Sequence, residues 1–454
     1  MGNDRGASEP SKIARPDAGG MLRLSICFLV PCLVSWVVTA IWVPLELHQA
    51  EEYWSLAQTP DAPPSLLRPP GYIEFLRLVG GAAHGFAPLY AAQAGLLGLA
   101  SAAFFLVARR WLNPAAACVL ALAFGCHPLA VVLVGYVHYD LLHLALLVLT
   151  SWCVVSAFGG SRISLPWAAL AGLAVGLTTL TRPMTLAYPA VLAVALWWLR
   201  PENRKASLLG WLALTAAMSL TLAPRALDNF QRTGRLVPVN AQSGAAFWPM
   251  TQIALHPTSD NFPWASAWWP AGDALVRSHL PPPYSADAFM TQTLTMDDLF
   301  KTEAWKLFRT QPTVYFENVA ENLLFFWTGD SRRFIRAFLF YQIAEQPSRT
   351  APWALGYFIF AGALLHMLAA YGAALALWRR ERTLVLAGSL FLTLWLIHSL
   401  VYLDARYLYA GLPFFLWFGA YGLREIWPGQ SRRDLAASAF LAALSLLGLG
   451  ALLI

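Results

Sequence analysis

Long stretches of apolar residues dominate the hydrophobic pattern of this chain. Runs of roughly 18 to 25 such residues are typical of helices that cross the ~30 Å hydrocarbon core of a bilayer, where only helices and closed barrels satisfy their own backbone hydrogen bonds. We count eleven runs of this kind. The pattern therefore predicts an all-α polytopic membrane protein with about eleven transmembrane helices, at residues 21–44, 86–108, 115–135, 138–158, 165–181, 184–200, 206–224, 352–378, 383–402, 406–424 and 435–454.

The polar stretches between these runs divide the chain into four parts. Residues 1–20 are polar and rich in Gly, Ser and Pro, which is typical of a disordered tail. A first transmembrane module is expected at 21–224, with its first outer loop at 45–85. A long outer loop follows at 225–351, and the remaining helices are expected at 352–454. The first apolar run is too long for a signal-peptide core, so we expect it to be retained as a span.

The long outer loop carries helical signals of its own. Apolar residues recur at helical spacing in its second half, with Asp297 and Asp298 as a candidate cap and Pro312 as a break. Amphipathic helices of this kind tend to lie in the plane of the membrane interface. Because loops of this length are usually functional, we expect this one to contribute to a site.

Basic residues at the ends of the runs are distributed unevenly. Lys and Arg near span ends are retained on the cytoplasmic side of a membrane. With the N-terminus inside, sixteen of the 31 basic residues fall on cytoplasmic ends and eleven in the long outer loop. The short outer loops hold only Arg68, Arg77, Arg182 and Arg406. We therefore expect a cytoplasmic N-terminus and an outward-facing first loop.

The composition sets limits on function. Hydrophobic residues make up 58% of the chain and charged residues only 12%, so the few ionisable groups near the membrane carry most of the functional information. The net charge of +6 mostly reflects the cytoplasmic bias, and no basic stripe interleaved with aromatics indicates nucleic-acid binding. The five cysteines fall in apolar runs without a CxxC spacing, which argues against a disulfide framework or a metal cage.

Outward-facing polar motifs occur after the first run and at the ends of later runs. Two adjacent carboxylates, Glu51 and Glu52, are followed by Tyr53 and then by Arg68-Pro69-Pro70-Gly71-Tyr72. The outer start of the fourth span carries His138-Tyr139-Asp140. The later motifs are Thr181-Arg182-Pro183, Arg225-x-x-x-Asn229 and Arg406-Tyr407.

The order and shared outer location of these motifs resemble the GT-C superfamily of glycosyltransferases. More narrowly, the chain is similar to the branch that uses polyprenyl-phosphate sugars and contains protein O-mannosyltransferases and bacterial aminoarabinose transferases. The resemblance covers roughly residues 21–425 and implies a GT-C-like fold with outer-face loops. It also implies a carboxylate beside the acceptor, for which Glu51 and Glu52 are the matches, and a second acid matched by Asp140. Members usually carry an Asp a few residues before the Tyr, so which glutamate acts as the base stays open.

The chemistry of sugar transfer explains why these residue types occur together. A base must deprotonate the acceptor hydroxyl, and cationic groups must stabilise the departing phosphate. Arginine suits phosphate because its planar fork donates two hydrogen bonds and stays charged. The predicted catalytic residues are therefore Glu51, Glu52 and Asp140. Arg406 and Arg182 are expected to be the main contacts to the lipid phosphate, with Arg225 next. The full set of predicted substrate-binding residues is Arg68, Tyr72, Arg182, Arg225, Asn229, Arg406 and Tyr407.

Each of these residues also has a structural interpretation. The glutamate pair is compatible with a solvated helix face or with a favourable charge at a helix N-terminus. Arg68 before Pro-Pro-Gly could anchor a turn. Arg182 and Arg406 could be interfacial residues that extend toward water, and Asp140 could cap the fourth span.

The sequence thus favours an integral membrane enzyme, an inverting glycosyltransferase of the bacterial cytoplasmic (inner) membrane. Its expected partners are a polyprenyl-phosphate sugar donor and an envelope glycan, lipid or protein acceptor on the outer side, and no nucleic acid. His48 and His138 lie near the carboxylates without a recognised metal spacing, so no metal ligands are assigned and the need for a divalent cation stays open. The alternatives are a secondary transporter or lipid flippase, which would place ionisable groups near the bilayer midplane, and a non-catalytic GT-C-like accessory protein.

Overall fold

The structure is a computed structural model whose regular elements are helices. It describes residues 18–41, 48–59, 66–80, 86–241, 243–244, 247, 286–328, 352–401, 408–427 and 432–453, and no strand occurs among them. Six of the described helices are long and apolar enough to cross a membrane. They are α1 (Ala18–Ile41), α5 (Phe86–Ala108), α8 (Asp140–Phe158), α11 (Arg204–Thr233), α17 (Pro352–Trp378) and α18 (Arg382–Leu400).

Shorter apolar helices complete the bundle. They are α6 (Pro114–Gly125), α9 (Leu165–Thr181) and α10 (Tyr188–Leu199), and the 3₁₀ turn η1 (Pro183–Ala187) precedes α10. Two further helices, α19 (Leu408–Ile426) and α20 (Arg433–Leu453), lie near the end of the chain. The expected all-α polytopic membrane fold is confirmed. The count of eleven spans stays a prediction, because six helices in the described ranges meet the length and composition of a span.

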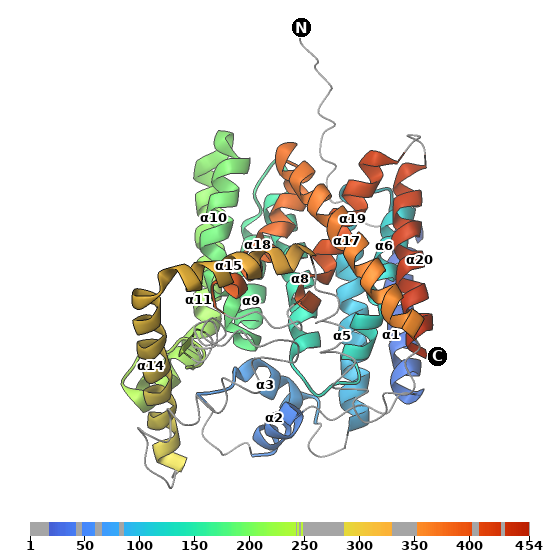
Figure 1. The fold of residues 1–454 in the computed structure, drawn as a ribbon. Coiled ribbons are helices and arrows are strands. Elements are labelled where there is room, and N and C mark those ends of the chain that lie inside the picture. Colours follow the sequence, from blue (N-terminus) through green and yellow to red (C-terminus); the bar gives the residue numbers. More distant parts are fainter. Residues whose placement is uncertain are drawn as a thin grey trace.

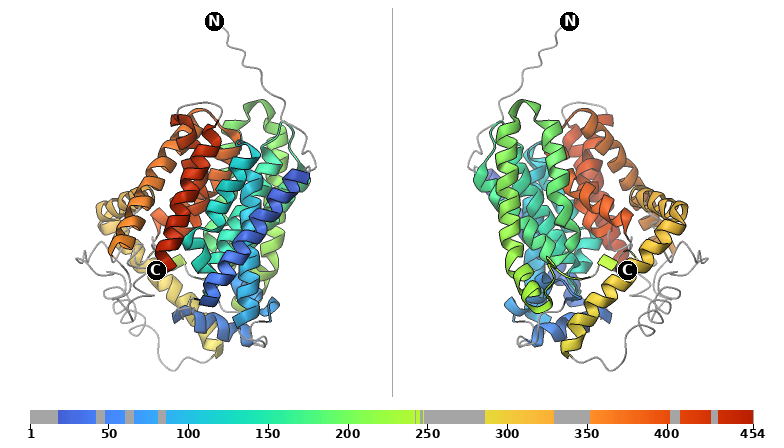
Figure 2. Two further views of the ribbon diagram at one scale, coloured as in Figure 1. Left: turned by 90° about the vertical axis from the view of Figure 1, so that its right-hand side faces the viewer. Right: turned by 90° about the vertical axis from the view of Figure 1, so that its left-hand side faces the viewer.

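The helices stand side by side in one bundle (Figure 1 and Figure 2). α1 packs against α5 and α6, α8 packs against α5 and α9, and α9 packs against α11. In the second half, α17 pairs with α19, α18 packs on α10, and α20 returns to lie on α6. Glycines allow some of these close approaches. A Cβ atom on Gly172 of α9, for example, would collide with the carbonyl oxygen of Leu214 on α11.

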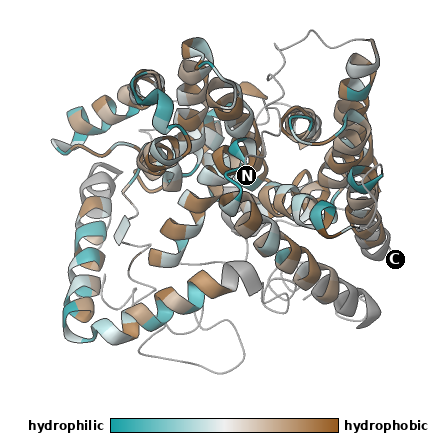
Figure 3. Cartoon of the chain, turned by 90° about the horizontal axis from the view of Figure 1, so that it is seen from above, coloured by the Kyte–Doolittle hydropathy of each residue, from teal (hydrophilic) through white to brown (hydrophobic). Residues whose placement is uncertain are grey.

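The outside of the bundle is apolar. Large hydrophobic side chains that are more than half exposed include Leu33, Trp197 and Leu220. Seen from above, hydrophobic residues predominate along the helices of the bundle (Figure 3). A broad apolar surface of this kind is unusual for a protein in water and suits contact with lipid tails.

The third apolar run is not one helix. α6 ends at Gly125, and a separate helix, α7 (Pro128–Leu133), begins after Cys126 and His127. Proline is favoured at the first position of a helix and cannot continue the preceding one, because it has no N–H to donate. Nδ1 of His127 accepts a hydrogen bond from the N–H of Leu129 (3.3 Å) and caps α7. The expected continuous span at 115–135 is therefore wrong.

α11 is longer than the apolar run that predicted it. The run ends at residue 224, but the helix continues through Pro224 to Thr233. It ends where Gly234 adopts the left-handed conformation (φ +67°), which glycine does without strain. Arg225 and Asn229 therefore lie on the last turns of α11.

Two further helices lie in the segment that was expected to form the long outer loop. They are α14 (Ala286–Thr310) and α15 (Pro312–Thr328), and α15 packs against α17 and α18. The helix break expected at Pro312 is confirmed, because α15 begins at this proline. Asp297 and Asp298 lie inside α14, which already begins at Ala286, so the expectation that they cap a helix is wrong.

Candidate active site

Two short helices cover one end of the bundle. α2 (His48–Gln58) and α3 (Pro70–Leu78) lie at the lower end in Figure 1. α2 packs against α3, and α3 packs against α9. A Cβ atom on Gly71 would lie 2.8 Å from the backbone nitrogen of Thr181, so glycine lets α3 approach the end of α9. This approach brings the turn that follows Arg68 next to Arg182.

Asp140 is the first residue of α8, and its side chain is only 7% exposed. One carboxylate oxygen lies 2.9 Å from Nδ1 of His138, and the other lies 3.7 Å from Nη1 of Arg182. Tyr139, not Asp140, occupies the cap position of α8. A carboxylate in the first turn of a helix is favoured by the helix dipole, and the side chain of Asp140 also contacts the residue that ends α9.

Arg182 reaches Asp140 because the chain is extended between α9 and η1. Arg182 has φ −151° and ψ 116°, a conformation favoured for the residue before a proline, and Pro183 begins η1. Its side chain is only 6% exposed, and its guanidinium carbon lies 5.5 Å from the centre of the Tyr139 ring. The arginine and the carboxylate are thus both removed from bulk water, where opposite charges interact more strongly than at an exposed surface.

Aromatic side chains enclose this pair. Tyr53 is 1% exposed, and its ring centre lies 5.5 Å from Tyr72, 5.8 Å from Tyr139 and 6.1 Å from His138. Burial raises the pKa of Tyr53 and of Tyr72 well above the usual value, so both hydroxyls stay protonated at neutral pH. The Tyr72 hydroxyl donates to Oε1 of Gln93 (3.2 Å). Within the described part of the chain, the buried Tyr53 hydroxyl has no hydrogen-bond partner.

Gln93 of α5 fixes the loop that leads to α8. It is fully buried, and its Nε2 donates to the carbonyl oxygens of Val134 (2.6 Å) and Tyr136 (2.9 Å). Neither Gln93 nor the role of Tyr53 was predicted from the sequence. A glutamine inside an apolar run was the available signal for Gln93, because a polar group inside the membrane needs partners.

Glu52 and Arg68 form a two-pronged ion pair beside the aromatic side chains. Nε of Arg68 donates to Oε1 of Glu52 (2.9 Å), and Nη2 donates to Oε2 (2.6 Å). The guanidinium carbon of Arg68 lies 5.7 Å from the centre of the Tyr53 ring. Burial lowers the pKa of Arg68, but the hydrogen bond to Glu52 and the neighbouring groups outweigh this and leave the pKa raised. Glu52 is 37% exposed, so this carboxylate can be reached from outside the bundle.

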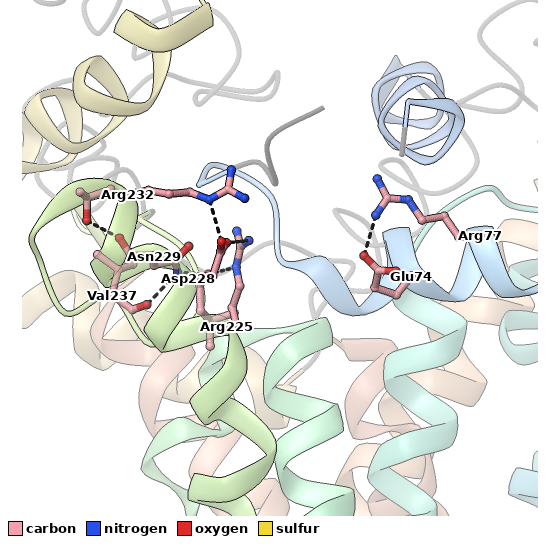
Figure 4. A network of polar contacts seen from close by, with 9 residues as sticks. Glu74, Arg77, Arg225, Asp228, Asn229, Arg232 and Val237 are labelled. Carbon is pink, nitrogen blue, oxygen red and sulfur yellow. Dashed lines mark hydrogen bonds and ion pairs between the residues drawn. The ribbon is translucent and has the colours of Figure 1, made fainter. Parts of the chain in front are cut away.

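Arg225 and Asn229 form a second polar group on α11 (Figure 4). Nε of Arg225 donates to the carbonyl oxygen of Val239 (3.3 Å) and its Nη1 lies 3.5 Å from Asp228. Nδ2 of Asn229 donates to the carbonyl oxygens of Val237 (2.8 Å) and Val239 (3.2 Å). These contacts hold the backbone that follows α11, and a role of the two residues in substrate binding stays a prediction.

Three predicted site residues are not described at the level of side chains. Glu51 lies on α2, but its side chain is outside the described residues, and so are Arg406 and Tyr407 altogether. Their predicted roles stay predictions. Among the described residues, no three His, Cys, Asp or Glu side chains are grouped so that they could hold a metal ion.

Comparisons with known proteins give matches to solved structures, whereas no family model and no curated protein matches the chain. The oligosaccharyltransferase of Archaeoglobus fulgidus in complex with Zn and sulfate is 14% identical, with a TM-score of 0.52 over 93% of this chain and 53% of that chain. Archaeal oligosaccharyltransferase AglB from Archaeoglobus fulgidus, in complex with an inhibitory peptide and a dolichol-phosphate, is 14% identical, with a TM-score of 0.50 over 94% and 55%. ArnT from Cupriavidus metallidurans bound to undecaprenyl phosphate is 16% identical, with a TM-score of 0.37 over 94% and 88%.

The likeness to the archaeal oligosaccharyltransferase concerns the fold. The chain has a GT-C fold, as the resemblance of its motifs implied. It spans about half the length of the oligosaccharyltransferase that it matches. The function of this chain is therefore inferred from its own residues and not from the activity of that enzyme.

Proposed function

We propose that this chain is a membrane glycosyltransferase that moves a sugar from a polyprenyl-phosphate donor to an acceptor hydroxyl. The observation that carries the proposal is the contact of buried Asp140 with Arg182 and His138 at one end of a GT-C fold. The Glu52–Arg68 pair is joined to this contact through Tyr53. Carboxylates and arginines held together beside membrane helices suit transfer from a lipid phosphate, which needs both a base and a cation.

The proposed donor has support from a structure of the same fold. The archaeal oligosaccharyltransferase was solved with a dolichol-phosphate. A lipid phosphate carries its charge at the membrane surface, where Arg68 and Arg182 are expected from the distribution of basic residues. We therefore assign the phosphate of the donor to these two arginines, with Arg406 and Tyr407 as further proposed contacts.

The proposed reaction proceeds in one displacement with inversion. Glu52 or Glu51 takes the proton from the acceptor hydroxyl, and the acceptor oxygen attacks the anomeric carbon on the face opposite the phosphate. The bond between the sugar and the phosphate breaks, and the phosphate leaves with the bonding electrons and stays on the lipid. Arg182 and Arg68 stabilise the negative charge of this leaving group. Asp140 holds Arg182 in place and supports the base.

We place the site on the extracytoplasmic side of a bacterial inner membrane. Asp140 lies at the N-terminus of α8, and Arg200 binds the carbonyl oxygen of Phe158 at the other end of the same helix. Arg200 belongs to the basic set that is expected in the cytoplasm. The proposed acceptor is a hydroxyl group of an envelope glycan, lipid or protein.

The function is tested by comparing the envelope of cells with and without the gene. Mass spectrometry of envelope glycans, glycolipids and glycoproteins is expected to show one sugar missing without the gene, restored by the wild-type chain and not by Asp140→Asn. No mass difference in any fraction would contradict the proposal. Full restoration by each of Asp140→Asn, Glu51→Gln and Glu52→Gln would contradict the assigned catalytic residues.

A further inference from the structure

Three parts of the chain contact the short segment that follows α11. They are the last turns of α11, the turn before Arg68, and α14. We call residues 237–241 together with 243–244 the bridging segment. α11 binds its first part through the side chains of Arg225 and Asn229 described above. The turn before Arg68 binds its middle, because the N–H of Ala241 donates to the carbonyl oxygen of Leu66 (2.8 Å). Nδ2 of Asn240 donates to the carbonyl oxygen of Leu67 (3.0 Å).

α14 binds the last part of the bridging segment through Asp297. Oδ1 of Asp297 accepts a hydrogen bond from the N–H of Gly244 (2.6 Å), and Oδ2 lies 3.3 Å from Oγ of Ser243 and 2.6 Å from Nζ of Lys301. Asp297 is only 4% exposed, so its charge depends on these partners. The fit is close, since a Cβ atom on Gly244 would collide with the carbonyl oxygen of Asp297.

Apolar contacts join the same three parts. Leu66 is fully buried and packs in one cluster with Ala241 of the bridging segment and Leu294 of α14. Leu294 lies three residues before Asp297, and residues with this spacing share a face of a helix. One face of α14 therefore holds both the bridging segment and the turn that carries Arg68.

We propose that Asp297 is a positioning residue for Arg68. It fixes the bridging segment, the bridging segment fixes the backbone of Leu66 and Leu67, and this backbone determines where the guanidinium of Arg68 meets Glu52. The inference rests on the proposed function, in which Arg68 binds the phosphate of the donor. Asp297 acts on the phosphate only through Arg68, so the long outer segment contributes to the donor site from a distance.

The neighbouring aspartate provides a matched control. Asp298 has the same charge on the same helix, but its side chain is 47% exposed and pairs with Arg235 (2.6 Å and 3.0 Å). Arg235 lies outside the bridging segment. Removing the carboxylate of Asp298 therefore changes the charge of α14 without releasing the turn before Arg68.

The first measurement is the binding of undecaprenyl phosphate to the purified full-length chain in nanodiscs. Asp297→Ala is expected to raise the Kd about tenfold, because a buried hydrogen bond to a charged group is lost. Asp297→Asn keeps an oxygen that accepts from Gly244, so its effect is expected to be smaller, about threefold. Asp298→Ala is expected to stay within about twofold of the wild type. If Arg68→Ala weakens binding, an unchanged Kd for Asp297→Ala would overturn the proposal, and Asp297→Asn keeps the test decisive if Asp297→Ala does not fold.

A double-mutant cycle separates positioning from general loss of structure. In an Arg68→Ala background, Asp297→Ala is expected to cause no further loss of binding, because its effect passes through Arg68. An equal loss in both backgrounds would show that Asp297 acts elsewhere and would end the proposal.

Amide hydrogen exchange distinguishes this proposal from the proposed function. Peptides that cover residues 66–72 and 237–244 are expected to exchange faster in Asp297→Ala and to be unchanged in Asp298→Ala. If Arg68→Ala binds undecaprenyl phosphate as tightly as the wild type, the assigned phosphate contact is wrong, and exchange alone then decides the coupling. Unchanged exchange at residues 66–72 would overturn the positioning role whatever the result for binding.

Discussion

Arginines are buried at both ends of the helix bundle, but their partners differ. At one end, Arg200 is 1% exposed and donates to the carbonyl oxygens of Phe158 (2.9 Å), Gly160 (2.9 Å) and Ser161 (2.6 Å). At the other end, the guanidinium of Arg182 lies 3.7 Å from Asp140 and 5.5 Å from the Tyr139 ring. The first arrangement closes the end of a helix, whereas the second brings a cation beside a carboxylate at a distance longer than a hydrogen bond.

Under the proposed function, this difference separates an arginine that supports the fold from one that contacts the donor. Both residues lie directly after an apolar helix in the sequence, and both are buried. Backbone carbonyls at a helix end are satisfied by the arginine and need nothing further. Arg182 instead lies 3.7 Å from a carboxylate, and the proposed function assigns to it a contact with the phosphate of the donor.

Replacing Arg182 or Arg200 with glutamine is expected to give the largest difference in sugar transfer between two variants. Arg182→Gln is expected to lower sugar transfer about 10²- to 10³-fold, because a cation that stabilises the leaving phosphate is lost. Arg200→Gln is expected to lower the free energy of unfolding by about 3 kcal/mol, because buried carbonyls lose their donors. Transfer per folded molecule should be unchanged in Arg200→Gln. Both are measured by transfer in cells and by thermal unfolding in detergent, and an equal loss of transfer in the two variants would remove the distinction.

Glu52 on α2 and Glu74 on α3 each pair with an arginine, and replacing them is expected to give the next largest difference in sugar transfer. Glu52 pairs with Arg68 beside the aromatic enclosure, whereas Glu74 pairs with Arg77 (2.8 Å) on an exposed face of α3. If Glu52 is the base, Glu52→Gln is expected to lower transfer about 10²-fold. Glu74→Gln is expected to stay within about twofold, because exposed ion pairs contribute little. If Glu52→Gln transfers normally, Glu51 becomes the proposed base.

Two buried tyrosines distinguish a hydroxyl that serves the fold from one that is available to a ligand. Tyr72→Phe is expected to lower the free energy of unfolding by about 1 kcal/mol, because Gln93 loses a partner. Tyr53→Phe is expected to leave it unchanged or to raise it, since the removed hydroxyl had no partner among the described residues. Binding of undecaprenyl phosphate should weaken about fivefold in Tyr53→Phe, as for one lost hydrogen bond to a charged group. A loss of stability in Tyr53→Phe would show that its hydroxyl has a structural partner.

The exposed pair of Asp298 and Arg235, in the expected long outer loop, is expected to have the smallest effect. The hydrogen bond from Arg235 lowers the pKa of Asp298, so the folded pKa lies below that of the unfolded chain. The resulting stabilisation is present above the unfolded pKa, about 3.9, and is lost as the pH falls through the folded value. Because both side chains are about half exposed, Asp298→Asn should lower the free energy of unfolding at pH 7 by only about 0.5 kcal/mol. The sign of this pH dependence is checked by thermal unfolding of the wild type and Asp298→Asn at two pH values. The two should differ in stability at neutral pH, and the difference should vanish at a pH below both pKa values.

The membrane architecture could be predicted because hydrophobic runs report directly which segments are long enough to span a bilayer. The residues at which helices break or continue were harder to predict from the sequence. Pro128 interrupts an apolar run that has uniform hydropathy, and α11 continues to Thr233 after its sequence turns polar. Hydropathy reports which residues contact lipid. Where a helix ends depends instead on capping interactions and on residues such as Gly234.

The candidate site could be predicted in part. Asp140, Arg182, Glu52, Arg68 and Tyr72 lie in one region, linked by ion pairs and ring contacts. The support of this region could not be predicted, because it depends on contacts between distant parts of the chain. Gly71 approaches Thr181, and Gln93 binds the loop before α8, through packing that no local motif encodes.

The most direct test of the donor site is the binding of undecaprenyl phosphate to the wild-type chain, Arg182→Gln and Arg200→Gln in nanodiscs. The wild type and Arg200→Gln are expected to bind with the same Kd, and Arg182→Gln at least about tenfold more weakly. Equal binding by Arg182→Gln and the wild type would contradict the assignment of this end of the bundle as the donor site.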